Sequence, residues 1–430
     1  MLAHDFPPSA SVGTLRTLRF AKYLPDYGWE PIILTLKENY YHLVDQSLFS
    51  DIKNFKNIYR TYSLKYPRRK DRETQQNKRK SLYYKIERIV KSIIPAPDDS
   101  IGWLPFALVK AFYLLKSKNI SVIYTTSPPH SVHLIGYLLK KLSKKPWIAD
   151  FRDPWTNWVP YLYTPPTEMR RKTQEYLEHT VLNCADKVIT NTEPMKEDFI
   201  NKYPDIDGEK YISITNGYDP DDFSHICVEQ KGKFTITYTG TLSFLDTQNP
   251  RYNPKFFLEA VKQLLEESPF LKEKLQIIFV GPGADTELAS KKIEKLNLEK
   301  VVKTVGPVSH KRCIQFLIRS HILLLIHYSG KGSEAWIPAK TFEYIGAGKP
   351  ILALAPKKGA TADLLKSLNA GIIVPPEEPE SIKKALFSLY RRYEKGNLKG
   401  PDPSLIQSLS IQRLTKKLVT ILESLAMTEK

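Results

Sequence analysis

Short apolar runs alternate along this chain with longer stretches in which apolar residues recur at every third or fourth position. A short run rich in Val, Ile and Phe is typical of a buried strand, and the longer recurrence is typical of an amphipathic helix. This alternation predicts an α/β fold with parallel sheets and helices on both faces. The predicted strands cover residues 31–35, 120–125, 147–150, 187–190, 211–215, 234–239, 276–280, 301–305, 322–326, 350–354 and 371–374.

The chain has 430 residues, which is too long for one ordinary hydrophobic core. Two domains of about 200 residues each are the natural expectation. The segment 224–232 is polar and shows no periodicity, so we predict an interdomain linker there. The predicted organisation is a first domain over 1–223, a second domain over 233–405, and a C-terminal helical segment over 406–430 that returns to the first domain.

Composition narrows the classes of partner and compartment. There are 64 Lys and Arg residues against 46 Asp and Glu, a net charge of +18 that would attract nucleic acid, acidic lipid or phosphorylated substrates. The three cysteines, Cys184, Cys227 and Cys313, are far apart and odd in number, which excludes a disulfide framework and fits a reducing compartment. No apolar run resembles a signal peptide or reaches the length of about 18 residues that a membrane span needs. A cytoplasmic protein is expected.

Candidate chemistry in the first half lies just after predicted strands, where ligands of open parallel sheets bind. His130 follows one strand, and a histidine there can donate to or accept from a substrate hydroxyl near neutral pH. Arg152 and Asp153 follow the next strand; they either line a site or pair within a scaffold loop that also contains Asp150. Gly13 precedes a helix, where it either lets backbone approach a phosphate or forms a plain turn.

In the second half, Gly240 and Gly281 each end a predicted strand. Either glycine could be a structural turn or a close approach to a nucleotide, and no complete dinucleotide fingerprint is present. Arg251 and Lys255 are four residues apart beyond the first of these strands. They could hold a diphosphate, with bidentate contacts from Arg and a point charge from Lys, or form a solvated pair.

Lys340 and Glu343 lie three apart on one face of a predicted helix. The Glu343 carboxylate could accept two hydrogen bonds from a ribose diol, or the two residues could form an ordinary surface pair. No HExxH motif and no metal-like cluster of carboxylates and histidines is found, so no metal site is predicted.

Together these segments resemble glycosyltransferase family 4, also called glycosyl transferases group 1, and within it a bacterial cell-envelope type. The similarity covers nearly the whole chain. It implies the GT-B fold, in which two Rossmann-like domains face each other across a cleft, with the acceptor bound by the first domain and the nucleotide sugar by the second. It rests on His4-Asp-Phe-Pro-Pro8, Thr126-Ser-Pro-Pro-His130, Ala149-Asp-Phe-Arg-Asp-Pro-Trp155, Lys340-Thr-Phe-Glu-Tyr344 and Gly348-Lys-Pro350.

The resemblance also implies roles for single residues. Glu343 matches the glutamate that holds the donor ribose, and Arg251 with Lys255 matches the basic pair on the diphosphate. Gly13 matches the glycine loop that faces the donor phosphates, and His130 matches a histidine that contacts the transferred sugar.

Two positions depart from the family pattern. The family's first motif glutamate is replaced by Ala335, with Glu334 one residue away, so the sugar contacts made there are in question. The family's first strand also begins several residues earlier than Met1-Leu-Ala3, which suggests a truncated or misassigned start.

The function implied is retaining, metal-independent transfer of a hexose-type sugar from a nucleoside-diphosphate sugar to an acceptor hydroxyl, in the synthesis of cell-surface polysaccharide or glycolipid. No cofactor is expected beyond the donor substrate. One alternative is a basic nucleic-acid-binding protein without enzymatic activity, but no binding module or interleaved basic and aromatic face is found. Another is a different GT-B enzyme, such as an epimerase. A nucleic-acid partner is not expected.

One stretch suggests contact with a membrane. Residues 65–91 contain eleven basic and three acidic residues, a net charge of +8. Ile93, Ile94 and the apolar run 103–108 follow, and cations beside apolar side chains are typical of an interfacial anchor. We therefore predict peripheral binding at the anionic inner face of a membrane and a lipid-linked glycan acceptor. The alternative is a solvated excursion, with 103–108 in the core.

Overall fold

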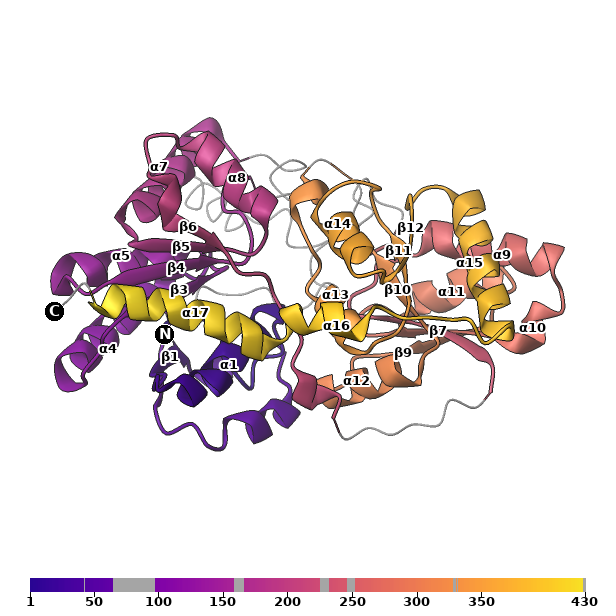
Figure 1. The fold of residues 1–430 in the computed structure, drawn as a ribbon, viewed down its shortest axis with the longest axis horizontal. Coiled ribbons are helices and arrows are strands. Elements are labelled where there is room, and N and C mark those ends of the chain that lie inside the picture. The colour runs from indigo at the N-terminus through magenta and orange to yellow at the C-terminus, as the bar shows by residue number, and fades with distance from the viewer. Residues whose placement is uncertain are drawn as a thin grey trace, which may run out of the picture. The chain divides into compact units, whose positions relative to one another are not determined.

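The computed structural model describes residues 1–41, 43–64, 97–157, 166–224, 232–245, 252–327, 330 and 332–427. The chain forms two compact units (Figure 1). The first comprises Met1–Ile214 with Thr415–Lys430, and the second comprises Thr215–Leu414. The division therefore falls at residue 214 and not at 223. Most of the predicted linker, residues 225–231 with Cys227, lies outside the described part of the chain.

The first unit is built on parallel strands. β3 to β6 pair in chain order, β1 pairs with β2, and Leu2 bridges both Leu34 of β1 and Thr125 of β3. β2 was not predicted because its side chains are mostly half-buried and form no apolar run. The strands are β1 (Ile33–Leu36), β2 (Ile58–Thr61), β3 (Ile123–Ser127), β4 (Trp147–Phe151), β5 (Lys187–Thr190) and β6 (Tyr211–Ser213).

Amphipathic helices supply the rest of the first unit's core. Trp147, Phe151 and Val188 from the central strands are fully buried, together with Val132 of α5 and Val181 of α7. The helices are α1 (Val12–Tyr23), α4 (Leu104–Ser117), α5 (Ser131–Ser143), α7 (Glu168–Cys184) and α8 (Glu193–Lys202). α17 (Ile411–Met427) is the C-terminal helix, and its residues from Thr415 onward belong to this unit.

The second unit holds a six-stranded parallel sheet in the order β12-β11-β10-β7-β8-β9. The central strand β10 is buried along its whole length, as expected for a parallel sheet covered on both faces. The strands are β7 (Phe234–Thr239), β8 (Leu275–Val280), β9 (Val302–Val305), β10 (Ile322–Ile326), β11 (Ile351–Leu354) and β12 (Gly371–Val374). The helices are α9 (Lys255–Glu267), α10 (Leu271–Lys274), α11 (Glu287–Lys295), α12 (His310–Arg319), α13 (Lys340–Gly346), α14 (Ala360–Ser367), α15 (Pro379–Glu394) and α16 (Pro403–Ile406).

The predicted α/β class with two parallel-sheet domains is therefore confirmed. The apolar run 103–108 divides between two environments: Trp103 and Ala107 are fully buried, whereas Phe106 is exposed. The basic segment 65–91 lies outside the described residues. Within the described part of the chain, no helix combines the length and apolar character that crossing a bilayer requires.

Candidate active site

The start of α1 and the loops after β3 and β4 meet at the Arg152 side chain, and Gly13 is the second residue of α1 and does not precede the helix as predicted. Arg152 Nη1 donates to the Gly13 carbonyl at 2.9 Å, and Nη2 donates to the Pro128 carbonyl. A side chain on Gly13 would collide with this guanidinium, since an added Cβ would lie 2.4 Å from Arg152 Nη2. The structure thus brings together Gly13, the loop after β3 and the loop after β4, and it supplies a packing reason for the glycine at 13.

Arg152 is a buried cation surrounded by carboxylates. Burial lowers the pKa of Arg152, while the charges of Asp150, Asp153 and Asp5 oppose that shift. Asp153 is half-buried on the same loop. A fixed guanidinium of this kind can orient an anionic or hydroxyl-bearing ligand.

Asp150 belongs to the scaffold. It is fully buried and accepts two hydrogen bonds from Arg16 of α1, from Nε at 2.9 Å and from Nη2 at 2.8 Å. Tyr124 and Thr126 donate to the same carboxylate at 2.6 and 2.8 Å. Burial alone would raise the pKa of Asp150, but the charge and hydrogen bonds of Arg16 hold it below its ordinary value. The pair locks α1 against β4, and no local motif indicates Arg16 as the partner of Asp150.

His130 immediately precedes α5 and stacks on Trp155. The ring centroids are 5.0 Å apart with an angle of 4° between the planes. Trp155 is in turn held by a hydrogen bond from its Nε1 to Gln174 Oε1 at 2.5 Å. Burial, with His133 and Arg152 nearby, lowers the pKa of His130 well below its ordinary value. His130 is therefore a neutral, oriented group close to Arg152.

In the second unit, Gly240 and Gly281 follow the adjacent strands β7 and β8. Both have positive φ, 116° and 131°, which favours glycine. A Cβ on Gly281 would lie 2.5 Å from the Gly240 carbonyl oxygen, and a Cβ on Gly240 would lie 2.4 Å from Lys340 Nζ. These glycines are required by the backbone and by close neighbours, and they leave the ammonium of Lys340 directly beside the end of β7.

Lys340, the first residue of α13, lies against Tyr238. Its Nζ donates to the Tyr238 hydroxyl at 2.7 Å and lies 3.9 Å from the ring centroid. Burial of the ammonium lowers its pKa to about 7. An anion bound there would favour the charged form, so Lys340 is suited to a phosphate.

Glu343 is paired with His310, a residue that was not predicted to belong to the site. His310, the first residue of α12, lies with Nε2 2.8 Å from Glu343 Oε1 and 4.0 Å from Asp222 Oδ2. Glu343 is 9% exposed, so the alternative of an exposed Lys340–Glu343 surface pair is wrong. His310 follows the loop after β9, and a search at every strand end would have found it. Arg251 lies outside the described residues.

Two further residues considered for the second unit's site, Lys255 and Glu334, are exposed. Lys255 begins α9, and its backbone N–H bonds Asn253 Oδ1 at 3.0 Å. Tyr252, three residues earlier, lies with its ring centroid 5.4 Å from Lys340 Nζ, which places the start of this segment beside Lys340. Glu334 accepts a hydrogen bond from the Gly332 N–H of its own turn. Among the described residues, no group of three or more His, Cys, Asp or Glu could hold a metal ion.

Known proteins similar to this chain include glycosyltransferases and, among solved structures, UDP-N-acetylglucosamine 2-epimerases. A D-inositol 3-phosphate glycosyltransferase of Geodermatophilus obscurus is 22% identical over 270 residues, which cover 58% of this chain and 57% of that protein. The chain thus spans little more than half the length of such relatives. A glycosyltransferase structure from Rickettsia africae matches with a TM-score of 0.60 at 14% identity, covering 99% of this chain and 97% of that one. The lipopolysaccharide outer core galactosyltransferase WaaB, in its apo form, matches with a TM-score of 0.57 at 13% identity, covering 98% of each chain.

Two family models match successive parts of the chain. The model of Glycosyltransferase Family 4 matches residues 15–222, and the model of Glycosyl transferases group 1 matches residues 230–397. Each match falls almost entirely within one of the two units. The chain therefore belongs to the family 4, group 1 glycosyltransferases and has the GT-B fold.

Proposed function

We propose that this protein is a retaining glycosyltransferase that moves a hexose-type sugar from a nucleoside-diphosphate sugar to an acceptor hydroxyl, without a metal ion. The observation that carries this proposal is the nearly buried Glu343, whose carboxylate is held by His310 beside the half-buried cation Lys340. A fixed carboxylate suits a ribose diol, and a cation within the same helix turn suits a phosphate.

In this proposal the second unit binds the donor and the first unit binds the acceptor. Negative charge grows on the leaving diphosphate, so fixed cations contribute most to catalysis. Lys340, Lys255 and Arg251 are the candidates in the second unit. His130, Arg152 and Asp153 bind the sugar and the acceptor in the first unit, where Arg152 holds the start of α1 at Gly13.

The test is a screen of nucleotide sugars by thermal unfolding and by release of nucleoside diphosphate. We expect one class of nucleotide sugar to raise the melting temperature and to be hydrolysed slowly without acceptor, and we expect chelator to leave this activity intact. A strict requirement for magnesium or manganese would contradict the metal-independent mechanism. Interconversion of the donor sugar without its release would identify an epimerase instead.

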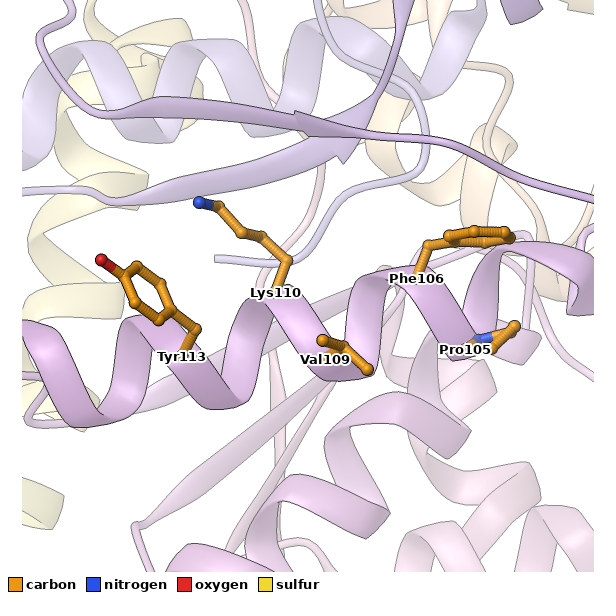
Figure 2. Close-up of a pocket in the computed structure, with 5 residues that line it drawn as sticks. All are labelled: Pro105, Phe106, Val109, Lys110 and Tyr113. Atoms are coloured by element: carbon orange, nitrogen blue, oxygen red, sulfur yellow. The ribbon is translucent and has the colours of Figure 1, made fainter.

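We further propose that the acceptor is a lipid-linked glycan at an anionic membrane surface, in cell-envelope polysaccharide or glycolipid synthesis. The support in the described residues is an apolar patch along α4, consisting of Phe106, Val109 and Tyr113 with Lys110, where an open pocket forms (Figure 2). Val109 is 73% and Tyr113 60% exposed, and the Lys110 ammonium lies 4.9 Å from the Tyr113 ring centroid. Tyr62 extends the patch, with its ring centroid 6.4 Å from that of Phe106.

The occupant that fits this patch is a bilayer with acidic lipid. Tyrosine rings beside lysines favour the headgroup region of a bilayer. In the sequence, the segment 65–91, with its net charge of +8, lies between Tyr62 and α4. Each lysine or arginine near such a surface contributes about 1 kcal/mol.

Sedimentation with vesicles tests the patch. We expect recovery with anionic vesicles that falls as salt is raised, and about tenfold weaker binding for Val109→Gln combined with Tyr113→Gln, because two apolar side chains no longer enter the interface. Replacing the Arg68-Arg-Lys70 and Lys78-Arg-Lys80 clusters with Gln should abolish binding. Tyr176→Gln is the matched control, since Tyr176 on α7 is 70% exposed outside the patch. Equal recovery with neutral and anionic vesicles, or none with either, would leave a soluble acceptor as the better proposal.

A further inference from the structure

A continuous chain of hydrogen bonds runs through the core of the first unit and ends at His130. Trp147 Nε1 donates to Thr125 Oγ1 at 2.8 Å, and Thr125 Oγ1 lies 2.8 Å from His133 Nδ1. His133 Nε2 lies 2.8 Å from Ser127 Oγ, which lies 3.1 Å from His130 Nδ1. Every member before His130 is completely buried. In the part of the chain that the structure describes, His130 Nε2 meets no hydrogen-bond partner.

The two histidines in this series of hydrogen bonds, His130 and His133, are neutral near pH 7. Burial, reinforced by the charge of Arg152, lowers the pKa of His133 to about 3, and the same effects lower the pKa of His130. A neutral imidazole carries one N–H and one lone pair. The proton on one ring therefore determines, through Ser127, which nitrogen of the other ring carries its proton.

Two arrangements satisfy every contact, and the distances separate them. If the Thr125 hydroxyl donates to His133 Nδ1, then His133 Nε2–H donates to Ser127, Ser127 donates to His130 Nδ1, and His130 carries its proton on Nε2. The reverse arrangement requires Thr125 to donate to the Ile148 carbonyl, which lies 3.4 Å away. That is beyond the usual O–H···O range, whereas the 2.8 Å contact to His133 is within it.

A third arrangement, in which both imidazoles donate to Ser127, is disfavoured. It would leave the buried Ser127 hydroxyl hydrogen without an acceptor among the described residues, and a buried donor without a partner is costly. The first arrangement alone makes every bond of the chain short and complete.

We infer that His130 presents a fixed Nε2–H as a hydrogen-bond donor to an oxygen of the bound substrate, and that Thr125, His133 and Ser127 are positioning residues that select this tautomer. His130 then serves as a donor and is not a general base at Nε2. The identity of that oxygen as a sugar hydroxyl or a diphosphate oxygen rests on the proposed function; the tautomer does not.

Nitrogen NMR of the full-length protein with labelled histidine, without ligand, tests the tautomer directly. His130→Asn assigns the signals of His130. We expect a pyrrole-type Nε2 and a pyridine-type Nδ1 for His130, unchanged between pH 6 and 8. A pyridine-type Nε2, or a titration with the ordinary histidine pKa, would overturn the inference.

Two variants of nearly equal size test the positioning role. Thr125→Val removes the hydroxyl and keeps the volume, so His130 should shift to a mixture of tautomers. Thr125→Ser keeps the hydroxyl and should retain the pyrrole-type Nε2. An identical His130 spectrum in both variants would show that Thr125 does not help to select the tautomer. Ser127→Ala then interrupts the series of hydrogen bonds at a second point, closer to His130.

The substrate contact is tested by titration with the nucleotide sugar that stabilises the protein most in the screen above, alongside its free nucleoside diphosphate. A shift of the His130 Nε2–H signal with the nucleotide sugar alone identifies a sugar hydroxyl, and a shift with both identifies a phosphate oxygen. A signal that moves with neither would overturn the contact. If no nucleotide sugar binds, the proposed function fails, while the ligand-free spectrum still decides the tautomer.

Discussion

Replacing Asp150 with alanine is expected to destabilise the protein by about 3–5 kcal/mol, because it leaves the guanidinium of Arg16 buried without its counter-charge. Arg16 is 5% exposed and donates two hydrogen bonds to the Asp150 carboxylate. Tyr124 and Thr126 lose their acceptor in the same change. Urea unfolding followed by circular dichroism measures the effect.

The double variant Arg16→Met with Asp150→Leu is the matched control. Replacing a buried ion pair with apolar residues of similar volume is often neutral or stabilising, so this variant should recover much of the lost stability. A single Asp150→Ala variant as stable as the wild type would show that water or a neighbouring carboxylate compensates Arg16.

The same carboxylate gives an acid dependence with a definite sign. Its pKa in the folded protein is below the ordinary value of 3.8. The unfolded chain therefore binds more protons in that range, and the stabilisation is complete above the ordinary pKa and is lost as pH falls through the lowered one. The slope of unfolding free energy against pH below 3.8 should be smaller in Asp150→Ala than in the wild type.

The fold could be predicted from local pattern because parallel strands buried on both faces are continuous apolar runs. β5, β7, β10 and β12 begin and end at the predicted residues. β2 could not be found this way, since a half-buried strand at the edge of a sheet has no such run. The end of the first unit at residue 214 also escaped prediction, because the segment after it joins the second unit through contacts such as the hydrogen bond from Tyr218 N to the Leu409 carbonyl.

The candidate site was predicted where a motif lies at a strand end, and was incomplete where a contact joins distant segments. Lys340 and Glu343 were identified by helical spacing, but their partners Tyr238 and His310 lie 102 and 33 residues away. Arg16 and Asp150 are 134 residues apart. Such pairs are set by the topology of the sheet, and no local pattern signals them.

Changing Glu343 to glutamine is expected to lower kcat/KM for the nucleotide-sugar donor by about 10- to 150-fold while leaving the melting temperature nearly unchanged. A hydrogen bond from a hydroxyl to a charged, buried acceptor contributes about 1.5–3 kcal/mol, and an amide keeps the shape of the side chain while losing the charge. Glutamine can still bond His310 Nε2, so the fold of α12 against α13 should persist. Steady-state kinetics at varied donor concentration, with thermal unfolding of the same samples, provides both quantities.

Glu266→Gln serves as the control for this prediction, because Glu266 is exposed and its carboxylate lies 3.8 Å from Lys262 Nζ on the surface of α9. Its kcat/KM should match the wild type. The loss in Glu343→Gln should appear with the intact nucleotide sugar and also as weaker binding of the free nucleoside diphosphate, since the ribose is present in both. A loss of kcat/KM with only one nucleotide sugar would indicate that Glu343 contacts the sugar and not the ribose. Unchanged kinetics would show that Glu343 is not part of the donor site.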